Sequence, residues 1–461
     1  MNNITIHNKT LPIPSFFQVF NYGGGAGDKT RELVYARLSG DTPALLNYYY
    51  INNEYTHLFQ SSYFNNILSF NKIGDALNYV TEQIITKDCC FYKESNIKPY
   101  DFNQKVILLD SGSSNIVKYV AKDCNYDIEK FKIKIIEHAI NYYNFANKLK
   151  VDMVVAFDLG GKYTFKDDEA NNIELQNFYR QLNKKEINHL LLEETIKYLK
   201  QNQGFYPYVL ATVHGDTPHN YGNYTKEILK LENSFNYQFF GFALGGIASS
   251  KNIDSSWYDG IKLPKNKKAK DATLPARAIN IVRRIVGNRY MHALGCGGYP
   301  NIPMNYYCGA SSFDAASPAR RVGDGNGLST SYIFSPRAAI PPKAKFSKYF
   351  VGGYNVDNSM RKENFDYISL YDIDNNLPLC GCDACNQIKD ITELKLLYSQ
   401  QANNAESFYY AKQLMNIHAI LQHKKLCQVV SSYNTMKDFC NNYSNELNRA
   451  LLFIYNQIVS T

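Results

Sequence analysis

Short apolar runs rich in β-forming residues alternate with longer amphipathic stretches along this chain of 461 residues. Between these runs, residues 127–150 and 186–202 carry apolar side chains at helical spacing, which predicts two amphipathic crossover helices. Strands that alternate with helices are typical of a parallel α/β sheet. The predicted strands are 106–110, 152–158, 208–214, 239–246, 290–295 and 311–314.

Nearly every predicted strand ends in Asp, His or Gly. A (β/α) barrel builds its active site at the C-terminal ends of its strands, so polar residues at these positions are placed for chemistry. We therefore predict an α/β fold of the TIM-type (β/α) barrel class. Residues 1–370 are expected to form this catalytic barrel domain.

The composition fits a folded protein with a substantial core, because 45% of the residues are hydrophobic and aromatic residues are frequent. The N-terminal residues lack a basic leader followed by an apolar core, and the chain has no uninterrupted apolar stretch of about 18 residues. Neither secretion nor membrane insertion is indicated. The net charge of +8 permits approach to a polyanion such as nucleic acid, but a mild basic excess is also common elsewhere.

The ten cysteines do not form the evenly spaced framework of a secreted disulfide-rich domain. Cys89 and Cys90 are adjacent, and three others lie close together in the run CGCDAC. A reducing, cytoplasmic location is therefore expected.

The run CGCDAC is followed, some thirty residues later, by a histidine in a helix-like stretch. Three thiolates and one imidazole make a closed tetrahedral zinc set with no open position for water, which indicates structural Zn²⁺. His423, Cys427 and Cys440 are nearby alternatives for the fourth ligand. We expect residues 371–461 to form a zinc-binding subdomain with C-terminal helices that pack on the barrel. The predicted ligands are Cys380, Cys382, Cys385 and His418.

Two other segments are expected to lie at the surface. The run NYGGGAGDKT at 21–30 resembles a phosphate loop, but Asp28 separates its glycines from the lysine, so a glycine-rich surface turn is expected before a strand-like stretch at 31–40. The basic, proline-flanked stretch 262–277 predicts a solvated surface loop.

Carboxylates end three of the predicted strands, at Asp110, Asp158 and Asp314. Each alone is often only a helix cap. Together on one barrel face they would repel one another, and such sites separate the pKa values of their carboxyl groups into acid and nucleophile roles. Ser111 begins a Ser-Gly turn that can aim backbone amides into the same pocket.

Five short motifs occur in the order found in the tRNA-guanine transglycosylase superfamily, and the chain resembles that family over roughly residues 100–420. The cysteine and histidine set follows where the family keeps its zinc. The matching motifs are DSGSSN at 110–115, AFD ending at Asp158, LGGIA at 244–248, LGCGG at 294–298 and FDAASPAR at 313–320.

The resemblance implies an enzyme that exchanges guanine in a nucleic acid for a 7-deazaguanine base. Asp314 resembles the nucleophile that forms a covalent intermediate with the sugar, and Asp110 resembles the general acid/base. Asp158 resembles the carboxylate that accepts hydrogen bonds from the amide and amino edge of guanine.

The resemblance also implies roles for residues that surround these carboxylates. Gly245 and Gly246 would offer backbone groups to the base, because glycine permits close approach. Arg320 matches an arginine of the family motif that could pair with a phosphate.

Three departures from the family pattern bear on the substrate. His214 replaces a glutamine and could donate to the guanine carbonyl, or could simply bond to backbone. Ser114 replaces the aromatic that stacks on the base, and a second arginine is replaced by Gly323, with Arg321 nearby. These differences favour the branch that inserts a 7-deazaguanine, such as 7-cyano-7-deazaguanine, into DNA.

Several alternatives stay open at this point. The chain resembles tRNA enzymes of the queuosine and archaeosine type almost as well, and a catalytically inactive nucleic-acid-binding partner subunit would keep the same fold. An unrelated metal hydrolase is disfavoured because its zinc would need an open coordination position. A DNA substrate would need its base flipped, which predicts a helicase-like or duplex-opening partner, and the family implies a possible homodimer.

Overall fold

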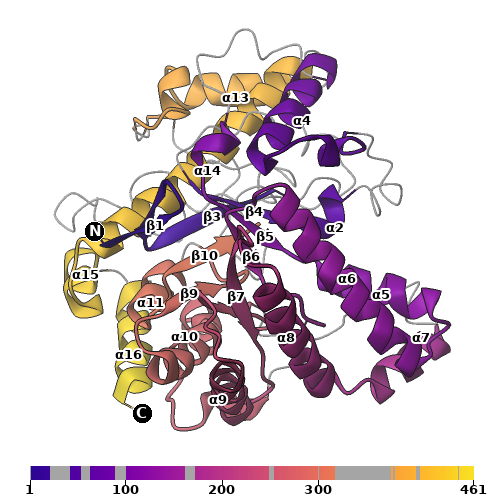
Figure 1. The fold of residues 1–461 in the computed structure, drawn as a ribbon. Helices are drawn as coiled ribbons and strands as arrows, with labels where there is room; N and C mark the ends of the chain where they lie inside the picture. Colours follow the sequence, from indigo (N-terminus) through magenta and orange to yellow (C-terminus); the bar gives the residue numbers. More distant parts are fainter. Residues whose placement is uncertain are drawn as a thin grey trace.

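The computed structural model describes residues 2–20, 42–52, 63–88, 100–160, 172–248, 254–298, 301–316, 375–376, 379, 381–400, 405–444 and 446–460. Its centre is a closed barrel of parallel strands in the order β10-β3-β4-β5-β6-β7-β8-β9, ringed by helices (Figure 1). This confirms the α/β, TIM-type barrel. The barrel strands are β3 (Ser15–Phe20), β4 (Ala44–Asn47), β5 (Ile107–Asp110), β6 (Met153–Val155), β7 (Tyr208–Val213), β8 (Gly241–Leu244), β9 (Tyr290–Ala293) and β10 (Ser312–Ala315).

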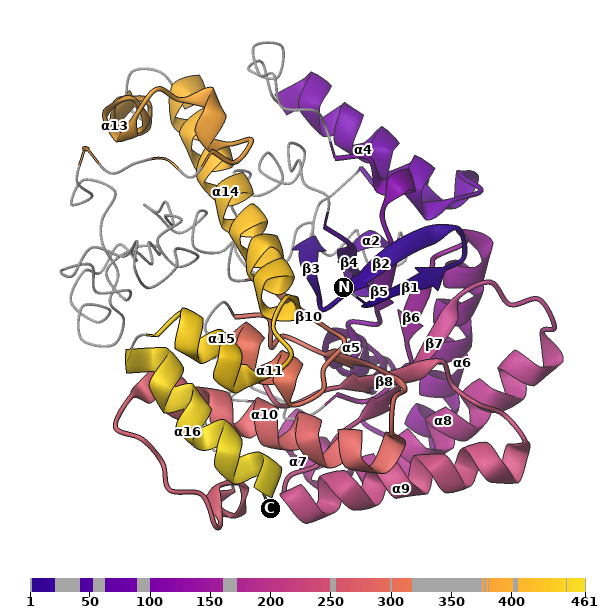
Figure 2. The same cartoon turned by 90° about the vertical axis from the view of Figure 1, so that its left-hand side faces the viewer.

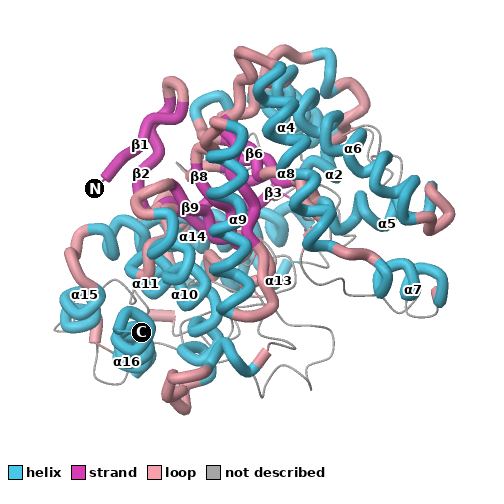
Figure 3. Tube along the Cα trace, turned by 60° about the horizontal axis from the view of Figure 1, so that its bottom comes forward, coloured by secondary structure: helices cyan, strands magenta, loops and turns pink. Residues whose placement is uncertain are grey.

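The helices lie outside the barrel and enclose its strands (Figure 3). None of the helices in the described ranges is long and apolar enough to cross a membrane. The helices are α2 (Tyr48–Ile51), η2 (Ile67–Ser69), α4 (Ile73–Asp88), η4 (Phe102–Gln104), α5 (Ser113–Asp123), α6 (Ile128–Lys148), α7 (Ile173–Gln181), α8 (Lys184–Gln201), α9 (Pro218–Phe235), η5 (Ser255–Tyr258), α10 (Lys267–Val286), α11 (Ile302–Tyr307), η11 (Cys385–Gln387), α13 (Ile391–Ser399), α14 (Ala405–Ser431), α15 (Met436–Asn442) and α16 (Glu446–Ser460).

Each predicted strand corresponds to one of β5 to β10, and the two predicted crossover helices are α6 and α8. The sequence did not predict β3 and β4, which complete the barrel. Strand β3 is buried along its whole length, and Gln18 interrupts its apolar run. Strand β4 runs directly into α2, so one largely apolar stretch contains both elements.

The prediction of a surface loop at 262–277 is wrong for most of that stretch, because α10 begins at Lys267 and continues through Pro275. The side chain of Asn266 caps the helix by accepting a hydrogen bond from the N–H of Ala269. Ala269, Ala272 and other apolar residues of α10 are fully buried. Burial of this face outweighs the local proline signal.

The inside of the barrel is a separate apolar layer that includes Phe17, Leu108, Met153 and Tyr290. A hairpin of β1 (Asn2–Ile6) and β2 (Lys9–Ile13) adds buried side chains to this layer.

An ion pair ties the hairpin to the barrel strands. The Lys9 Nζ lies 2.8 Å from Oδ2 of the buried Asp152, which precedes β6, and 2.7 Å from the carbonyl oxygen of Lys105, which precedes β5. The hairpin therefore covers the N-terminal end of the barrel, and the opposite end, where the strands finish, carries the site.

The C-terminal helices pack against the barrel and its helices. Helix α14 runs from α13 towards the barrel and contacts β3 (Figure 2). Helix α16 packs on α10, where Arg284 Nη2 donates to the carbonyl oxygen of Val459 at 2.8 Å. The predicted domain boundary at residue 370 lies outside the described residues, as do the glycine-rich turn at 21–30 and the strand-like stretch at 31–40.

Candidate active site

Asp110 is the last residue of β5 and pairs in register with Asn47 of the neighbouring strand β4. Asn47 Nδ2 and the N–H of Gly112 each donate to Asp110 Oδ2 at 3.3 Å. Burial is the main cause that raises the pKa of Asp110 from 3.8 to about 7, and the charges of Asp158 and Asp314 contribute to the same rise. Asp158 and Asp314 therefore lie close enough for their charges to act on Asp110.

The Ser-Gly turn after Asp110 connects two of these carboxylates. Gly112 adopts a φ of 66°, a left-handed conformation that suits glycine, and α5 begins directly after it. Ser111 is fully buried, and its Oγ accepts a hydrogen bond from the N–H of Ser113 at 3.2 Å. The Oγ of Ser113 donates to Asp158 Oδ1 at 3.2 Å, so Ser113 is the serine of this turn that reaches a site carboxylate.

Asp158 follows β6 and is paired with His214, which follows the neighbouring strand β7. The Oδ2 of Asp158 accepts a hydrogen bond from the N–H of Gly160 at 3.0 Å and also contacts His214 Nε2. The two side chains predicted to contact a guanine base thus lie together. The other imidazole nitrogen of His214, Nδ1, is buried and has no hydrogen-bond partner within the described ranges.

Gly245 and Gly246 follow β8 and lie against His214. A Cβ on Gly245 would lie 2.4 Å from His214 Cε1, so the glycine makes room for the imidazole. The N–H of Gly245 donates to the carbonyl oxygen of Val213 at 3.0 Å and is used within the fold. Gly246 has a φ of 76° and is exposed at the same end of the barrel.

Asp314 lies on β10 and is buried, with a relative exposure of 7%. Its Oδ1 accepts a hydrogen bond from the N–H of Gly295 at 2.7 Å and lies 3.1 Å from Nε2 of His292. No hydrogen bond reaches Oδ2 from any described residue.

His292 is a site residue that the sequence analysis missed. It lies on β9 within the apolar run 290–295, where a histidine is easily taken for part of the core. Alternation along β9 puts His292 on the same face as Tyr290, which points into the barrel. That alternation, together with the prediction of a barrel, is the signal that could have identified it.

Lys184, the first residue of α8, was also missed. Burial lowers its pKa to about 8, while the charges of Asp216 and Asp158 act in the opposite direction. A cation therefore lies near the Asp158 side of the site. No local pattern marks this lysine, because its place depends on where α8 begins relative to β6 and β7.

A second cluster joins Cys382 and Cys385 to His418 on α14. The Sγ atoms of the two cysteines lie 3.4 and 3.2 Å from His418 Nδ1, and all three ligand atoms lie within 4.8 Å of one another. Sulfur and nitrogen ligands on one tetrahedral metal ion lie roughly 3.5 Å apart at the usual bond lengths. The three side chains therefore fit a single metal ion.

His423, the alternative fourth ligand, has a different environment. Its Nδ1 donates to the carbonyl oxygen of Ala419 at 2.6 Å, and its ring lies 4.6 Å from that of Phe16. The remaining predicted ligand, Cys380, lies outside the described residues, as do Arg320 and Arg321, the predicted phosphate contacts.

No protein-family model matches the chain, and no curated protein matches it. The fold and the site define the protein as a TIM-type barrel with converging carboxylates at the C-terminal end of its strands. A Cys2His cluster able to bind a metal ion lies beside the barrel.

Proposed function

We propose that the protein is a guanine transglycosylase that exchanges guanine in DNA for a 7-deazaguanine base. The observation that carries this proposal is the difference between two neighbouring carboxylates. Asp314 holds one oxygen in hydrogen bonds and leaves the other available, whereas Asp110 has a pKa raised to about 7. One carboxylate suits a nucleophile and the other suits an acid that also acts as a base near neutral pH.

The exchange takes two balanced displacements. Oδ2 of Asp314 forms a bond to C1′ of the nucleotide as the bond from C1′ to N9 of guanine breaks, and Asp110 supplies the proton that the leaving base takes up. The incoming 7-deazaguanine then gives its N9 proton to Asp110 and attacks C1′. The ester bond breaks, and both carboxyl groups return to their starting states.

Base recognition falls to Asp158 and His214 in this proposal. The carboxylate of Asp158 accepts hydrogen bonds from the amide N–H and the amino group of guanine, and His214 donates to its carbonyl oxygen. Both groups must exchange the bond they make to each other for bonds to the base. The cation of Lys184 lies close enough to Asp158 for the two charges to attract each other.

DNA is preferred as the substrate because His214, Ser114 and Gly323 depart from the pattern of the tRNA enzymes. A target base in a duplex must leave the stack before Asp314 reaches C1′, and unpaired DNA removes that cost. A helicase-like or duplex-opening partner would supply unpaired DNA in the cell.

The metal in this proposal is a structural Zn²⁺ held by Cys380, Cys382, Cys385 and His418. Four protein ligands leave no position for a reacting water molecule, so the ion would stabilise the fold only. Soft thiolate ligands combined with one imidazole favour zinc over magnesium or calcium.

The purified protein, incubated with radiolabelled guanine and single-stranded DNA, duplex DNA or tRNA in separate reactions, tests the proposal. We expect label to enter single-stranded DNA and to be lost on a chase with 7-cyano-7-deazaguanine. Label that enters tRNA alone would assign the protein to the tRNA enzymes. Label in neither nucleic acid would overturn the proposed function.

A further inference from the structure

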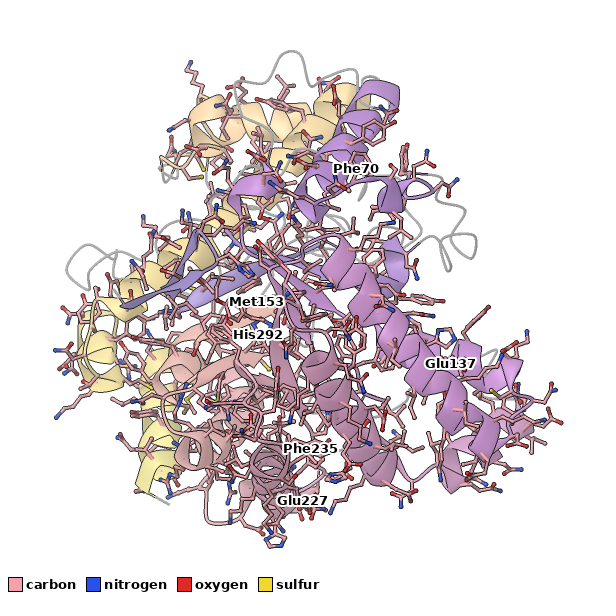
Figure 4. All side chains as sticks on the ribbon, in the orientation of Figure 1. Phe70, Glu137, Met153, Glu227, Phe235 and His292 are labelled. Atoms are coloured by element: carbon pink, nitrogen blue, oxygen red, sulfur yellow. The ribbon has the colours of Figure 1, made fainter. Side chains whose placement is uncertain are left out.

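His292 lies on β9 in the middle of the molecule (Figure 4) and is fully buried. The ring of Phe17 meets it edge to face, with ring centroids 5.3 Å apart. A buried imidazole is costly unless its two nitrogens are hydrogen-bonded. The groups that bond to the two ring nitrogens therefore indicate the role of His292.

Both nitrogens of His292 are bonded, and they belong to a chain of four buried groups. Nδ1 lies 2.8 Å from Oγ of Ser312, which in turn lies 2.5 Å from the hydroxyl oxygen of Tyr290. Nε2 lies 3.1 Å from Oδ1 of Asp314. The chain runs from the apolar middle of the barrel to the carboxylate at its reactive end.

The chemistry of the two ends fixes the direction of every bond in this chain. An ionised Asp314 can only accept, so Nε2 of His292 donates and Nδ1 accepts from the hydroxyl of Ser312. Burial raises the pKa of Tyr290, so its hydroxyl keeps its proton and donates to Ser312 Oγ. An imidazole with its hydrogen on Nε2 therefore satisfies the whole chain.

Oδ1 of Asp314 consequently receives two donors, Nε2–H of His292 and the N–H of Gly295. These two bonds come from β9 and from the turn that follows it. They prevent the carboxylate from rotating and leave Oδ2 as the oxygen that faces a substrate.

We propose that His292 is a positioning residue for the nucleophile Asp314. This inference rests on the proposed base exchange. When Oδ2 forms the bond to C1′, Oδ1 becomes the carbonyl oxygen of the ester, and when that bond breaks the electron pair returns to the carboxylate. Donors on Oδ1 hold Oδ2 in line for the attack and stabilise the carboxylate as it leaves.

Two substitutions separate positioning from simple packing. In His292→Gln the terminal amide nitrogen takes the place of Nε2 and can still donate to Asp314. In His292→Asn the shorter side chain takes the place of Nδ1 and keeps only the contact with Ser312. Both variants lose the ring and its contact with Phe17, so they are matched in lost packing.

The test is base exchange into single-stranded DNA by the full-length wild type and both variants, with melting temperatures measured in parallel. We expect kcat to fall on the order of 100-fold in His292→Asn and under about tenfold in His292→Gln. The KM for guanine should stay at the wild-type value in both, because Asp158 and His214 are untouched. Equal losses of kcat in the two variants would overturn the inference and leave the base exchange standing.

A third variant keeps the inference testable if His292→Asn does not fold. Ser312→Ala removes the hydroxyl that donates to Nδ1 of His292. The imidazole is then free to change tautomer, so kcat should fall while the KM for guanine is unchanged. An unchanged kcat in Ser312→Ala would also overturn the inference. Absence of exchange by the wild type would overturn the proposed function and this inference with it.

Discussion

His214 Nε2 bonds to Oδ2 of Asp158 across the ends of the neighbouring strands β7 and β6. The pair is held from several sides, because Gly160 and Ser113 also donate to Asp158 and Gly245 lies against the imidazole. A ligand with hydrogen-bond donors can bind Asp158, and an acceptor on the same ligand can bind His214. Such a ligand would replace the bond between the two side chains. The pair is therefore held in place in the absence of any ligand.

His214→Ala should weaken base binding and leave the nucleophile intact. Loss of a hydrogen bond that involves a charged or ionisable group corresponds to a rise in KM for guanine of roughly 10- to 100-fold. Steady-state exchange at varied guanine concentration measures this. His219→Ala, which removes an exposed histidine of α9, is the matched control. A KM that is the same in both variants would contradict the role of His214.

Gly245→Ala should act through the same imidazole. The added Cβ would lie 2.4 Å from His214 Cε1, so His214 must move away from Asp158. We expect a rise in KM for guanine that is comparable with that of His214→Ala. In a His214→Ala background the substitution should have no further effect on KM, because the group it displaces is gone. Additive effects in the double variant would show that Gly245 acts in another way.

The raised pKa of Asp110 predicts how stability depends on pH. The unfolded carboxyl loses its proton near 3.8, whereas the folded one keeps it up to about 7. Between these pH values the unfolded state binds fewer protons, so this group lowers the free energy of unfolding as the pH rises from about 4 to about 7. The loss is complete above pH 7.

Asp110→Asn removes the carboxyl group that lowers the free energy of unfolding as the pH rises. The variant should also lose base exchange. The variant should be more stable than the wild type at pH 8 by about 4 kcal/mol, and this advantage should shrink towards pH 4. Urea unfolding at both pH values measures it. Asp259→Asn, which removes an exposed carboxylate, controls for the change in net charge. An Asp110→Asn advantage that is equal at the two pH values would contradict the raised pKa.

Cys382→Ser should release the metal and destabilise the region around α14. The substitution replaces a thiolate ligand that lies 3.4 Å from His418 Nδ1. We expect bound zinc, measured by elemental analysis of the purified protein, to fall from about one per chain to none, with a lower melting temperature. Cys124→Ser, at a buried cysteine next to α5, should keep its zinc. A folded, zinc-free and fully active Cys382→Ser protein would contradict a structural role for the metal.

Alternation of strands and helices was enough to predict the barrel, because each of β5 to β10 is an apolar run bounded by polar residues. The same rule placed Asp110, Asp158 and Asp314 at the C-terminal end of the barrel, since each lies at or near the C-terminal end of a strand. Strands β3 and β4 were not predicted, because Gln18 interrupts the apolar run of β3 and β4 runs directly into α2. Helix α10 was missed because Pro275 signals a break that the buried face of the helix overrides.

The parts of the site that the sequence did not indicate depend on contacts between distant segments. His292 and Asp314 are brought together only by the pairing of β9 with β10. The charges of Asp216 and Asp158, which are distant in the sequence, act on Lys184. By contrast, the metal cluster was predicted from the run CGCDAC and a histidine some thirty residues later, and the family resemblance then favoured His418 over His423.

The central claim is that Asp314 forms a covalent bond to the sugar, and mass analysis of the trapped enzyme tests it most directly. The enzyme is incubated with a guanine-containing single-stranded DNA oligonucleotide in the absence of free base, denatured and digested with protease. The account predicts a sugar-linked adduct on the peptide that carries Asp314. In Asp314→Asn the adduct should be absent and exchange should fall on the order of 10⁴-fold or more. An adduct on another residue, or exchange that persists in Asp314→Asn, would contradict the account.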